Sequence, residues 1–431
     1  MWLKLILIRK MKKAGKKGSW KTVRKLFNDV HLWVGLISGI FVFVICLSGT
    51  IYVYNTEIRE MSAPHLHQVN PTGQKIEIDQ LSRIVEQESQ ANITSINVPS
   101  DASKSYQINV RKEGDKSRFG EGYFIDPYTG QILGTTKEEN KTAEFMGYMF
   151  SLHRWLLLDK IETPLIGDLP NRKLGSYISG GMTILFTLGL LTGIVIWFPR
   201  KIRNWRQGLA IKFDSNWKRI NHDIHNSLAF YAFLFLLIMG LTGPQWSFDW
   251  YRDGLRKTLG TYQEAPEKGK EKGDKGKGNK GKDKSEVAKK EDLELLPIST
   301  YLAKADQEFP HTGDLRISLP AMSGEDVKIS KYKAGFFAPA AADQLSLNAQ
   351  DASVQELSIF RDKPLNERVS GSIKALHIGD VYGQFSKLIY FLACLIATSL
   401  PVTGTLIWVN KMKKKKVGKK LPVRELSHES I

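Results

Sequence analysis

Two histidines stand at the same end of two long apolar segments. His31 begins the apolar part of DVHLWVGLISGIFVFVICLSG, residues 29–49, and His225 does the same in DIHNSLAFYAFLFLLIMGLTG, residues 223–243. Each histidine is equally far from the Ser-Gly or Thr-Gly pair that ends its segment. Histidines that border apolar segments of this length are uncommon, so both are candidates for a functional role.

A second pair of histidines precedes two further apolar segments. Leu152-His153 and Leu376-His377 stand ahead of segments that end in the related motifs TGIVIW and TGTLIW. Two neutral imidazoles that face each other can bind haem iron from both sides of the porphyrin. The pairs His31/His225 and His153/His377 are therefore candidate axial ligands of two haems.

A purely structural role stays open for these histidines. A histidine at a membrane surface is often only a hydrogen-bonded polar group, and a duplication would copy it. Zinc is the rival metal, but it prefers three or four clustered ligands, and paired histidines are too few. His222 lies one helical turn before His225 on the same face, so it could bond a haem propionate or ligate in place of His225. We expect the remaining histidines to be exposed: His65, His67, His311 and His428.

The other motifs exclude several kinds of chemistry. Cys46 and Cys394 both lie within apolar segments, and no C-x-x-C-H motif for covalent haem attachment occurs. The sequence also lacks the G-x-S-x-G, H-E-x-x-H and dinucleotide-binding motifs. We assign no residue to acid–base or nucleophilic catalysis, and any reaction with NADH or NADPH would need another protein.

Four apolar segments each reach the ~20 residues of a membrane-spanning helix. They lie at 32–54, 174–198, 226–247 and 385–409. Their central parts contain no Asp, Glu, Lys or Arg, and one such residue would cost about 2.5–3.5 kcal/mol there. The sequence therefore predicts an α-helical membrane protein with four transmembrane helices.

Lys and Arg gather in the N-terminal segment, in the loop between the second and third spans, and in the C-terminal tail. By the positive-inside rule these parts are cytoplasmic, including both termini, and the two long intervening segments lie outside. The net charge of +18 follows from this bias and from one lysine-rich tract. We therefore expect a lipid bilayer, and not nucleic acid, as the partner of this charge.

Each long outer segment has the pattern of a small α+β domain. In the first, a helix at 78–90 precedes the strand-like runs TSINVPS, SYQINVRK and GYFIDPYTGQILG. In the second, a helix at 296–309 precedes GDLRISLP, EDVKISKYK and DQLSLNAQDASVQELSIF. The chain thus resembles two copies of a span–outer domain–span unit, which implies an approximate two-fold axis along the membrane normal.

The predicted organisation combines these segments with a tract that is rich in Lys and Gly and is expected to be a disordered linker. Its parts are a basic N-terminus (1–30), the first span (31–54), outer domain 1 (55–143), an interfacial segment with His153 (144–173), the second span (174–198), a basic cytoplasmic loop (199–221), the third span (222–247), an outer segment (248–263), the linker (264–290), outer domain 2 (291–371), the His377 segment with the fourth span (372–409) and a basic tail (410–431).

Several stretches along the chain form a recognisable set: DVHLWVGL, LHRWLLL, TGIVIWFPRK, WRQGLAIKF, DIHNSLAFY, LHIGDVYG and TGTLIW. They resemble the PepSY-associated transmembrane family, iron-regulated inner-membrane proteins that include ferric-siderophore reductases. The outer domains look like PepSY domains, most clearly in YFIDPYTGQILG. The resemblance implies two b-type haems, with His31, His153, His225 and His377 as ligands.

The resemblance also implies a location in the bacterial inner membrane and electron delivery to a ferric siderophore or other ferric chelate in the periplasm. Some members carry a flavin reductase domain that this chain lacks, so the donor stays open between a flavoprotein and a quinol. The alternative function is a non-redox, membrane-anchored PepSY module that binds a partner or inhibits or regulates a protease.

Overall fold

The computed structural model of the chain describes residues 20–115, 120–199, 202–264, 295–321, 324–336, 339 and 341–417. Apart from its first residue, the predicted linker at 264–290 lies outside the described residues, as do most of the basic N-terminus and the end of the basic tail. The chain divides into two compact units. The membrane unit comprises the chain up to Val53, Tyr148–Arg252 and the chain from Ile389, and the sheet unit comprises Tyr54–Gly147 and Asp253–Leu388.

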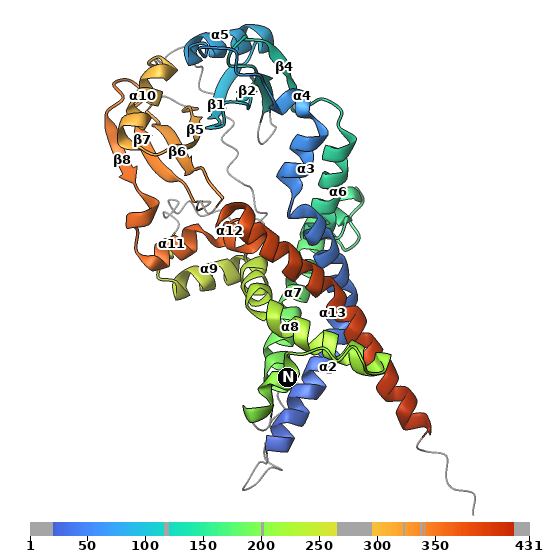
Figure 1. Ribbon diagram of the computed structural model, residues 1–431. Helices are drawn as coiled ribbons and strands as arrows, with labels where there is room; N and C mark the ends of the chain where they lie inside the picture. Colours follow the sequence, from blue (N-terminus) through green and yellow to red (C-terminus); the bar gives the residue numbers. More distant parts are fainter. Residues whose placement is uncertain are drawn as a thin grey trace, which may run out of the picture. The chain divides into compact units, whose positions relative to one another are not determined.

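Four helices are long and apolar enough to cross a membrane among the residues that the structure describes. They are α2 (Trp20–Tyr52), α7 (Asn171–Trp197), α8 (Trp217–Thr242) and α13 (Gly383–Val417). Each contains most of one of the four predicted apolar segments, so that prediction is confirmed. The protein is a multi-pass membrane protein (Figure 1).

Small residues allow α7, α8 and α13 to pack closely. Their shared core contains Leu190, Ala232, Leu236, Ala393, Ala397 and Leu400. Gly240 of α8 lies so close to Thr187 of α7 that an added Cβ would overlap the Thr187 hydroxyl oxygen. Small residues at helix contacts are expected in a bilayer, because association there depends on close van der Waals packing.

Short helices join the spans to the rest of the chain. In the order of the sequence they are α3 (Asn55–Ser62), α4 (Pro64–His67), α6 (Lys141–Trp155), η1 (Leu158–Lys160), η2 (Ile202–Gly208), η3 (Gly243–Trp246), α9 (Asp249–Thr258), η5 (Phe360–Asp362), α11 (Leu365–Gly371) and α12 (Ile373–Ile378). Of these, α6 has most bearing on the site, because it carries His153.

One antiparallel sheet of eight strands forms the centre of the sheet unit, in the order β4-β3-β2-β1-β5-β6-β7-β8. Its strands are β1 (Asn92–Val98), β2 (Tyr106–Arg111), β3 (Glu121–Ile125), β4 (Ile132–Thr135), β5 (Gly313–Ser318), β6 (Val327–Lys333), β7 (Asp343–Leu347) and β8 (Val354–Ser358). Pairing of β1 with β5 joins two meanders of four strands.

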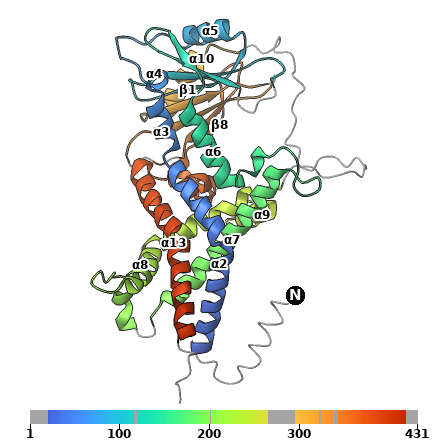
Figure 2. The ribbon, with the colours of Figure 1, turned by 90° about the vertical axis from the view of Figure 1, so that its right-hand side faces the viewer.

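Two helices cover the same apolar face of this sheet. Leu81 and Val85 of α5 (Ile78–Ser89) pack on β1 and β2, and Tyr301 of α10 (Ile298–Glu308) packs on β5 to β7. Figure 2 shows α5 above the strands of the first meander. The Asp79 carboxylate of α5 accepts hydrogen bonds from the first two backbone N–H groups of α10, at 2.6 and 3.2 Å. An acidic side chain is favourable there because the start of a helix carries partial positive charge.

The joined sheet is a feature that the sequence does not predict. The sequence patterns indicate two outer domains, at 55–143 and 291–371, each with its own strands. The predicted helices and strand runs are present, but the strands of both segments lie in one sheet. The reason is that Ser95–Val98 of β1 pair with Leu315–Ser318 of β5, which leaves neither meander with a free edge at that side.

Candidate functional site

The predicted inner pair of histidines is brought together within the membrane unit. The ring centres of His31 on α2 and His225 on α8 lie 6.4 Å apart, with the ring planes at 79°. A metal–imidazole bond of about 2.0 Å, plus roughly 1.2 Å from the nitrogen to the ring centre, places the centres of two axial imidazoles about 6.4 Å apart. The observed distance between the ring centres of His31 and His225 equals this value.

Hydrogen bonds to a neighbouring helix define which ring nitrogen of His31 carries the hydrogen. His31 Nδ1 lies 2.9 Å from the backbone oxygen of Gly189 and 3.2 Å from the hydroxyl oxygen of Thr192, both on α7. A carbonyl oxygen can only accept, so Nδ1 donates. The lone pair is then on Nε2, which is the nitrogen that a metal would bind.

His225 has the same kind of support from α13. Its Nδ1 lies 2.8 Å from the hydroxyl oxygen of Thr403. The Thr403 hydroxyl donates its own hydrogen to the backbone oxygen of Ser399, at 3.0 Å, so its oxygen accepts from His225. Thr192 and Thr403 therefore bond the two imidazoles in the same tautomer.

A glycine follows each of these threonines and leaves space for the ring. A Cβ added to Gly193 would lie 3.1 Å from His31 Cε1, and one added to Gly404 would lie 3.2 Å from His225 Cε1. In the Thr-Gly pair that begins TGIVIW and TGTLIW, the threonine thus accepts a hydrogen bond from the histidine, and the glycine leaves space for the histidine ring. Sequence reasoning missed these residues as part of the site, although their occurrence in both halves of the chain was the signal that could have found them.

A cavity of about 320 Å³ lies beside the two histidines, bordered by α2, α7, α8 and α13. This volume is within the ~300–1,000 Å³ range of small-molecule and cofactor sites. Its wall includes Gly35 and Gly39 of α2 and several aromatic side chains, among them Phe186, Phe233 and Trp408. His31 and His225 are the lining side chains that could hold a metal-containing cofactor in this cavity.

A metal ion can also be held by a cluster of side chains alone. Across the described part of the chain, no group of three or more His, Cys, Asp or Glu side chains is arranged to hold a metal ion. Structural zinc sites usually have four such ligands, and catalytic ones three.

His222 lines the same cavity but has a different setting. Its side chain is half-exposed, with Nδ1 3.6 Å from Asp223 Oδ1 and the ring 3.4 Å from the Asn226 amide. These contacts lie within its own helix, α8, whereas Thr403 bonds His225 from α13. The two residues that the sequence leaves as alternative ligands therefore differ in their support, which comes from another helix for His225 and from its own helix for His222.

His153 is held against the other end of α2. Its Nδ1 donates to the backbone oxygen of Ile45 at 2.8 Å, and a Cβ on Gly49 would lie 2.9 Å from the same nitrogen. Burial lowers the pKa of His153, the hydrogen bond to Ile45 raises it to a lesser degree, and nearby Arg154 lowers it further. The ring is therefore neutral at physiological pH, with the lone pair on Nε2. From His31 to Ile45 the distance along the helix is about 21 Å, at about 1.5 Å per residue.

Contacts with α7 and η3 fix the end of α6 that carries His153. A Cβ on Gly175 would overlap the backbone oxygen of Trp155, so only glycine fits there. The Ser179 hydroxyl donates to the backbone oxygen of Arg154 at 2.8 Å, and the Arg154 guanidinium donates to the backbone oxygen of Trp246 at 3.1 Å. These contacts fix the backbone of α6 at Arg154 and Trp155 as well as the Arg154 side chain. The position of the neighbouring His153 therefore depends on the packing of α6 against α7.

His377 lies near the end of α12, in the sheet unit. His153 belongs to the membrane unit, so the predicted pairing of His153 with His377 stays a prediction.

Two of the remaining histidines are not exposed, contrary to the prediction. His311 is partly buried because its Nε2 lies 2.9 Å from the buried carboxylate of Asp343, and His67 packs with its ring centre 4.8 Å from that of Phe124. His65 is exposed, in agreement with the prediction. His428 lies outside the described residues.

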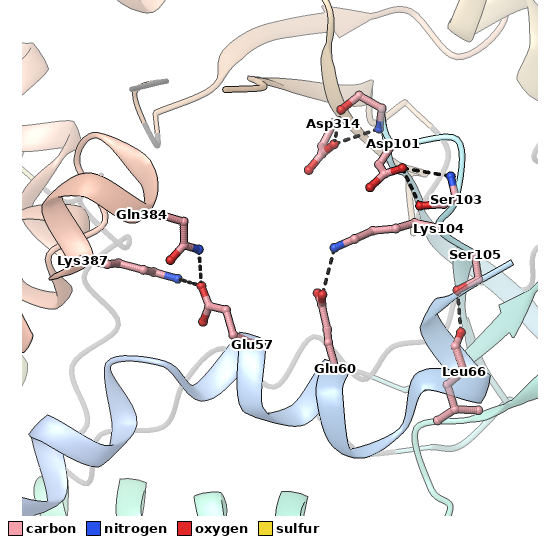
Figure 3. Close-up of polar contacts among 11 residues, drawn as sticks. Glu57, Glu60, Leu66, Asp101, Ser103, Lys104, Ser105, Asp314, Gln384 and Lys387 are labelled. Carbon is pink, nitrogen blue, oxygen red and sulfur yellow. Dashed lines mark hydrogen bonds and ion pairs between the residues drawn. The ribbon is translucent and has the colours of Figure 1, made fainter. Parts of the chain in front are cut away.

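Charged side chains at the start of α13 and on α3 form a cluster in the sheet unit (Figure 3). The Glu57 carboxylate accepts a hydrogen bond from the buried Lys387 ammonium at 2.7 Å and another from Gln384. Burial raises the pKa of Glu57, but these hydrogen bonds outweigh it and the pKa is lowered. On the next turn of α3, Glu60 pairs with Lys104 at 2.9 Å. This cluster joins the segment after the first span to the beginning of the fourth.

Comparison with known proteins assigns the chain to a family. A family model described as PepSY-associated TM region matches residues 29–411, and no curated protein matches the chain. The matched range includes the apolar parts of all four spans, the eight strands and the four candidate histidines. Since it covers nearly the whole chain, the protein belongs to the PepSY-associated transmembrane family.

Proposed function

We propose that this protein binds haem and carries electrons across the inner membrane of a bacterium to a ferric siderophore or another ferric chelate. The observation that carries the proposal is the spacing of His31 and His225, whose ring centres lie 6.4 Å apart beside a cavity. Bound between them, a haem would supply reversible one-electron chemistry.

The residues around this pair fit such a group. Thr192 and Thr403 accept hydrogen bonds from Nδ1 of the two rings, which leaves the lone pair of each Nε2 for a metal. The glycines in the cavity wall have no side chains that would fill the space. The aromatic residues there supply the apolar surface that a macrocycle prefers. The protein's part in this chemistry is to hold two neutral imidazoles in place and to exclude water from them.

A second haem is proposed for His153 and His377. His153 has the same hydrogen-bonding pattern as His31, because its Nδ1 donates to a backbone oxygen. It lies about 21 Å along α2 from His31, so the two candidate sites would lie at two levels of the bilayer. Two redox groups at different levels are what electron transfer across a membrane needs.

The order of the segments supports a direction for this transfer. The loop between α7 and α8 and both termini are rich in Lys and Arg, which favours a cytoplasmic location for the ends of the spans near His31 and His225. His153 would then lie toward the periplasm, where a ferric chelate arrives. A flavoprotein or quinol on the inner side is the proposed donor.

The arrangement of the sheet supports the proposal that the chain is a duplication with two PepSY-like halves. Each half has one helix followed by a meander of four strands, and β1 and β5 meet at the centre of the sheet. The threonines that bond His31 and His225 are related by the same repeat.

Absorption spectroscopy tests the proposal directly. Full-length protein purified from haem-replete cells should show a Soret band that shifts when dithionite is added. Addition of a ferric chelate should then reverse the shift, because Fe(III) takes the electron and is released more readily as Fe(II). Colourless protein from such cells would contradict the proposal and favour the alternative of a non-redox PepSY module that binds a partner or regulates a protease.

A further inference from the structure

The loop between η1 and α7 exposes apolar side chains that the proposed function does not explain. It covers residues 161–170, with the sequence IETPLIGDLP. The exposed fractions are 42% for Ile161, 56% for Leu165 and 59% for Ile166. Adjacent Leu and Ile side chains at the tip of a loop are unfavourable in water, so a partner surface is expected to cover them.

This loop has a defined structure that points its tip outward. The buried side chain of Asn171 accepts a hydrogen bond from the backbone N–H of Leu165 at 2.9 Å, and donates to the backbone oxygens of Ile161 at 2.8 Å and Thr163 at 2.6 Å. Gly167 allows the sharp turn at the tip, since its φ is +48°. The apolar tip is therefore held in place before it meets a partner, which reduces the entropy lost on contact.

The position of Asn171 indicates what that partner is. Asn171 is the first residue of α7, which is one of the four membrane-spanning helices. A loop tied directly to this residue lies where the span meets the bilayer surface. A bilayer crossed by α7 would be the large apolar surface nearest to such a loop.

Charged and aromatic residues at the base of the loop fit the same surface. Three pairs of a cation with an aromatic ring lie there: Lys160 is 5.1 Å from the ring centre of Tyr148, Arg172 is 4.1 Å from that of Trp155, and Lys173 is 5.7 Å from that of Tyr177. Such pairs are typical of the headgroup region. Glu162 and Asp168 on either side of the tip are exposed, and they limit insertion to the boundary between headgroups and acyl chains.

We propose that residues 161–170 form a surface anchor whose tip, Leu165 and Ile166, enters the lipid leaflet in which α7 begins. The insertion of this anchor into the leaflet does not require bound haem. It fixes the depth of α7 and of the α6 end that carries His153, because the chain from His153 to Asn171 passes through it.

Site-directed fluorescence tests the anchor. A polarity-sensitive dye is attached to Cys in the Leu165→Cys, Ile166→Cys and Asp168→Cys variants, in a Cys46→Ala, Cys394→Ala chain reconstituted into vesicles of phosphatidylethanolamine and phosphatidylglycerol. We expect a blue-shifted emission and quenching by spin-labelled lipid at positions 165 and 166, and neither effect at position 168, which is the matched control in the same loop.

The role of Asn171 gives a second measurement. Asn171→Ala should weaken the quenching at position 165, because the tip is no longer held outward. Equal, water-like emission at 165, 166 and 168 would overturn the proposal, and it would do so whether or not the protein binds haem. Water-like emission that becomes protected only in assembled complexes would also overturn it and assign the tip to a protein partner.

Discussion

Thr403 accepts a hydrogen bond from Nδ1 of His225 at 2.8 Å, across the contact between α13 and α8. Thr403→Val keeps the shape of the side chain but removes this acceptor, so the ring keeps only its hydrogen bond to the backbone of Leu400. The loss of one hydrogen bond costs about 0.5–1.5 kcal/mol. We expect haem affinity at this site to fall about 10–100-fold, as is usual when a residue that orients a metal ligand is lost. A haem titration of the apoprotein measures this loss.

The conservative variant separates hydrogen bonding from packing. Thr403→Ser keeps the hydroxyl and should retain most of the affinity, together with the reduction potential of the native site. If the Val and Ser variants behave alike in both measurements, the hydroxyl does not support a haem ligand.

His31→Ala and His225→Ala should each remove the same haem. Their rings border one cavity, so a haem held by both would lose one of its two protein ligands in either variant. Quantitation as pyridine haemochrome should fall from about two haems per chain to about one in each variant and in the double variant. His222→Ala is the control and should keep both haems, because the His222 ring lies at the cavity wall against residues of its own helix. Loss of haem in His222→Ala but not in His225→Ala would exchange the roles of these two residues.

Glycine-to-alanine substitutions should affect the two sites separately. The added methyl of Gly193→Ala would lie 3.1 Å from His31, and that of Gly49→Ala would lie 2.9 Å from His153. Such close contacts displace the ring, so each variant should lose occupancy of the haem at its own histidine, read from low-temperature spectra of the two haems. Gly181→Ala on α7 is the control, because its methyl would meet nothing within 4 Å. Equal effects of Gly193→Ala and Gly49→Ala on one spectral component would contradict two separate sites.

Acid should weaken the protein partly through Glu57. Its pKa is lowered by the hydrogen bonds from Lys387 and Gln384, which outweigh burial. A carboxyl group with a lowered pKa stabilises the fold above its unfolded pKa of about 4.3, and this contribution is lost as the pH falls through the lower, folded value. Thermal unfolding in detergent from pH 7 to pH 3 should show this loss.

The Glu57→Gln variant should flatten that pH dependence and cost about 1–2 kcal/mol at pH 7, as expected for a partly exposed charged hydrogen bond. Glu60→Gln removes the more exposed pair with Lys104 and should cost less. A pH profile unchanged by Glu57→Gln would show that the Glu57–Lys387 pair does not contribute to stability.

The sequence is sufficient to predict features that depend on local pattern. The four spans follow from the length and composition of their apolar segments, and the helices at 78–90 and 296–309 follow from residue spacing. His31 and His225 can be paired because each stands equally far from the end of its segment. Neither inference needs knowledge of which segments touch.

Contacts between distant segments cannot be predicted in this way. The pairing of β1 with β5 depends on register between strands far apart in the chain, and no turn between them signals it. Thr403 and Gly404 belong to a repeated motif, but their contact with His225 depends on how α13 packs against α8. The sequence alone predicts an exposed His311, because its partner, Asp343, comes from a different strand.

The joined sheet also implies a delay between the synthesis of β1 and that of the strand with which it pairs. Ser100 beside β1 bonds with Asp314 of β5, 214 residues later in the chain. Translation adds about 5–20 residues per second, so β5 is synthesised roughly 10–40 s after β1. During that time the edge of β1 is unpaired and open to other chains. Production of this protein should therefore depend on chaperones that shield the first meander until translation has passed β5, and on the speed of translation between the two halves.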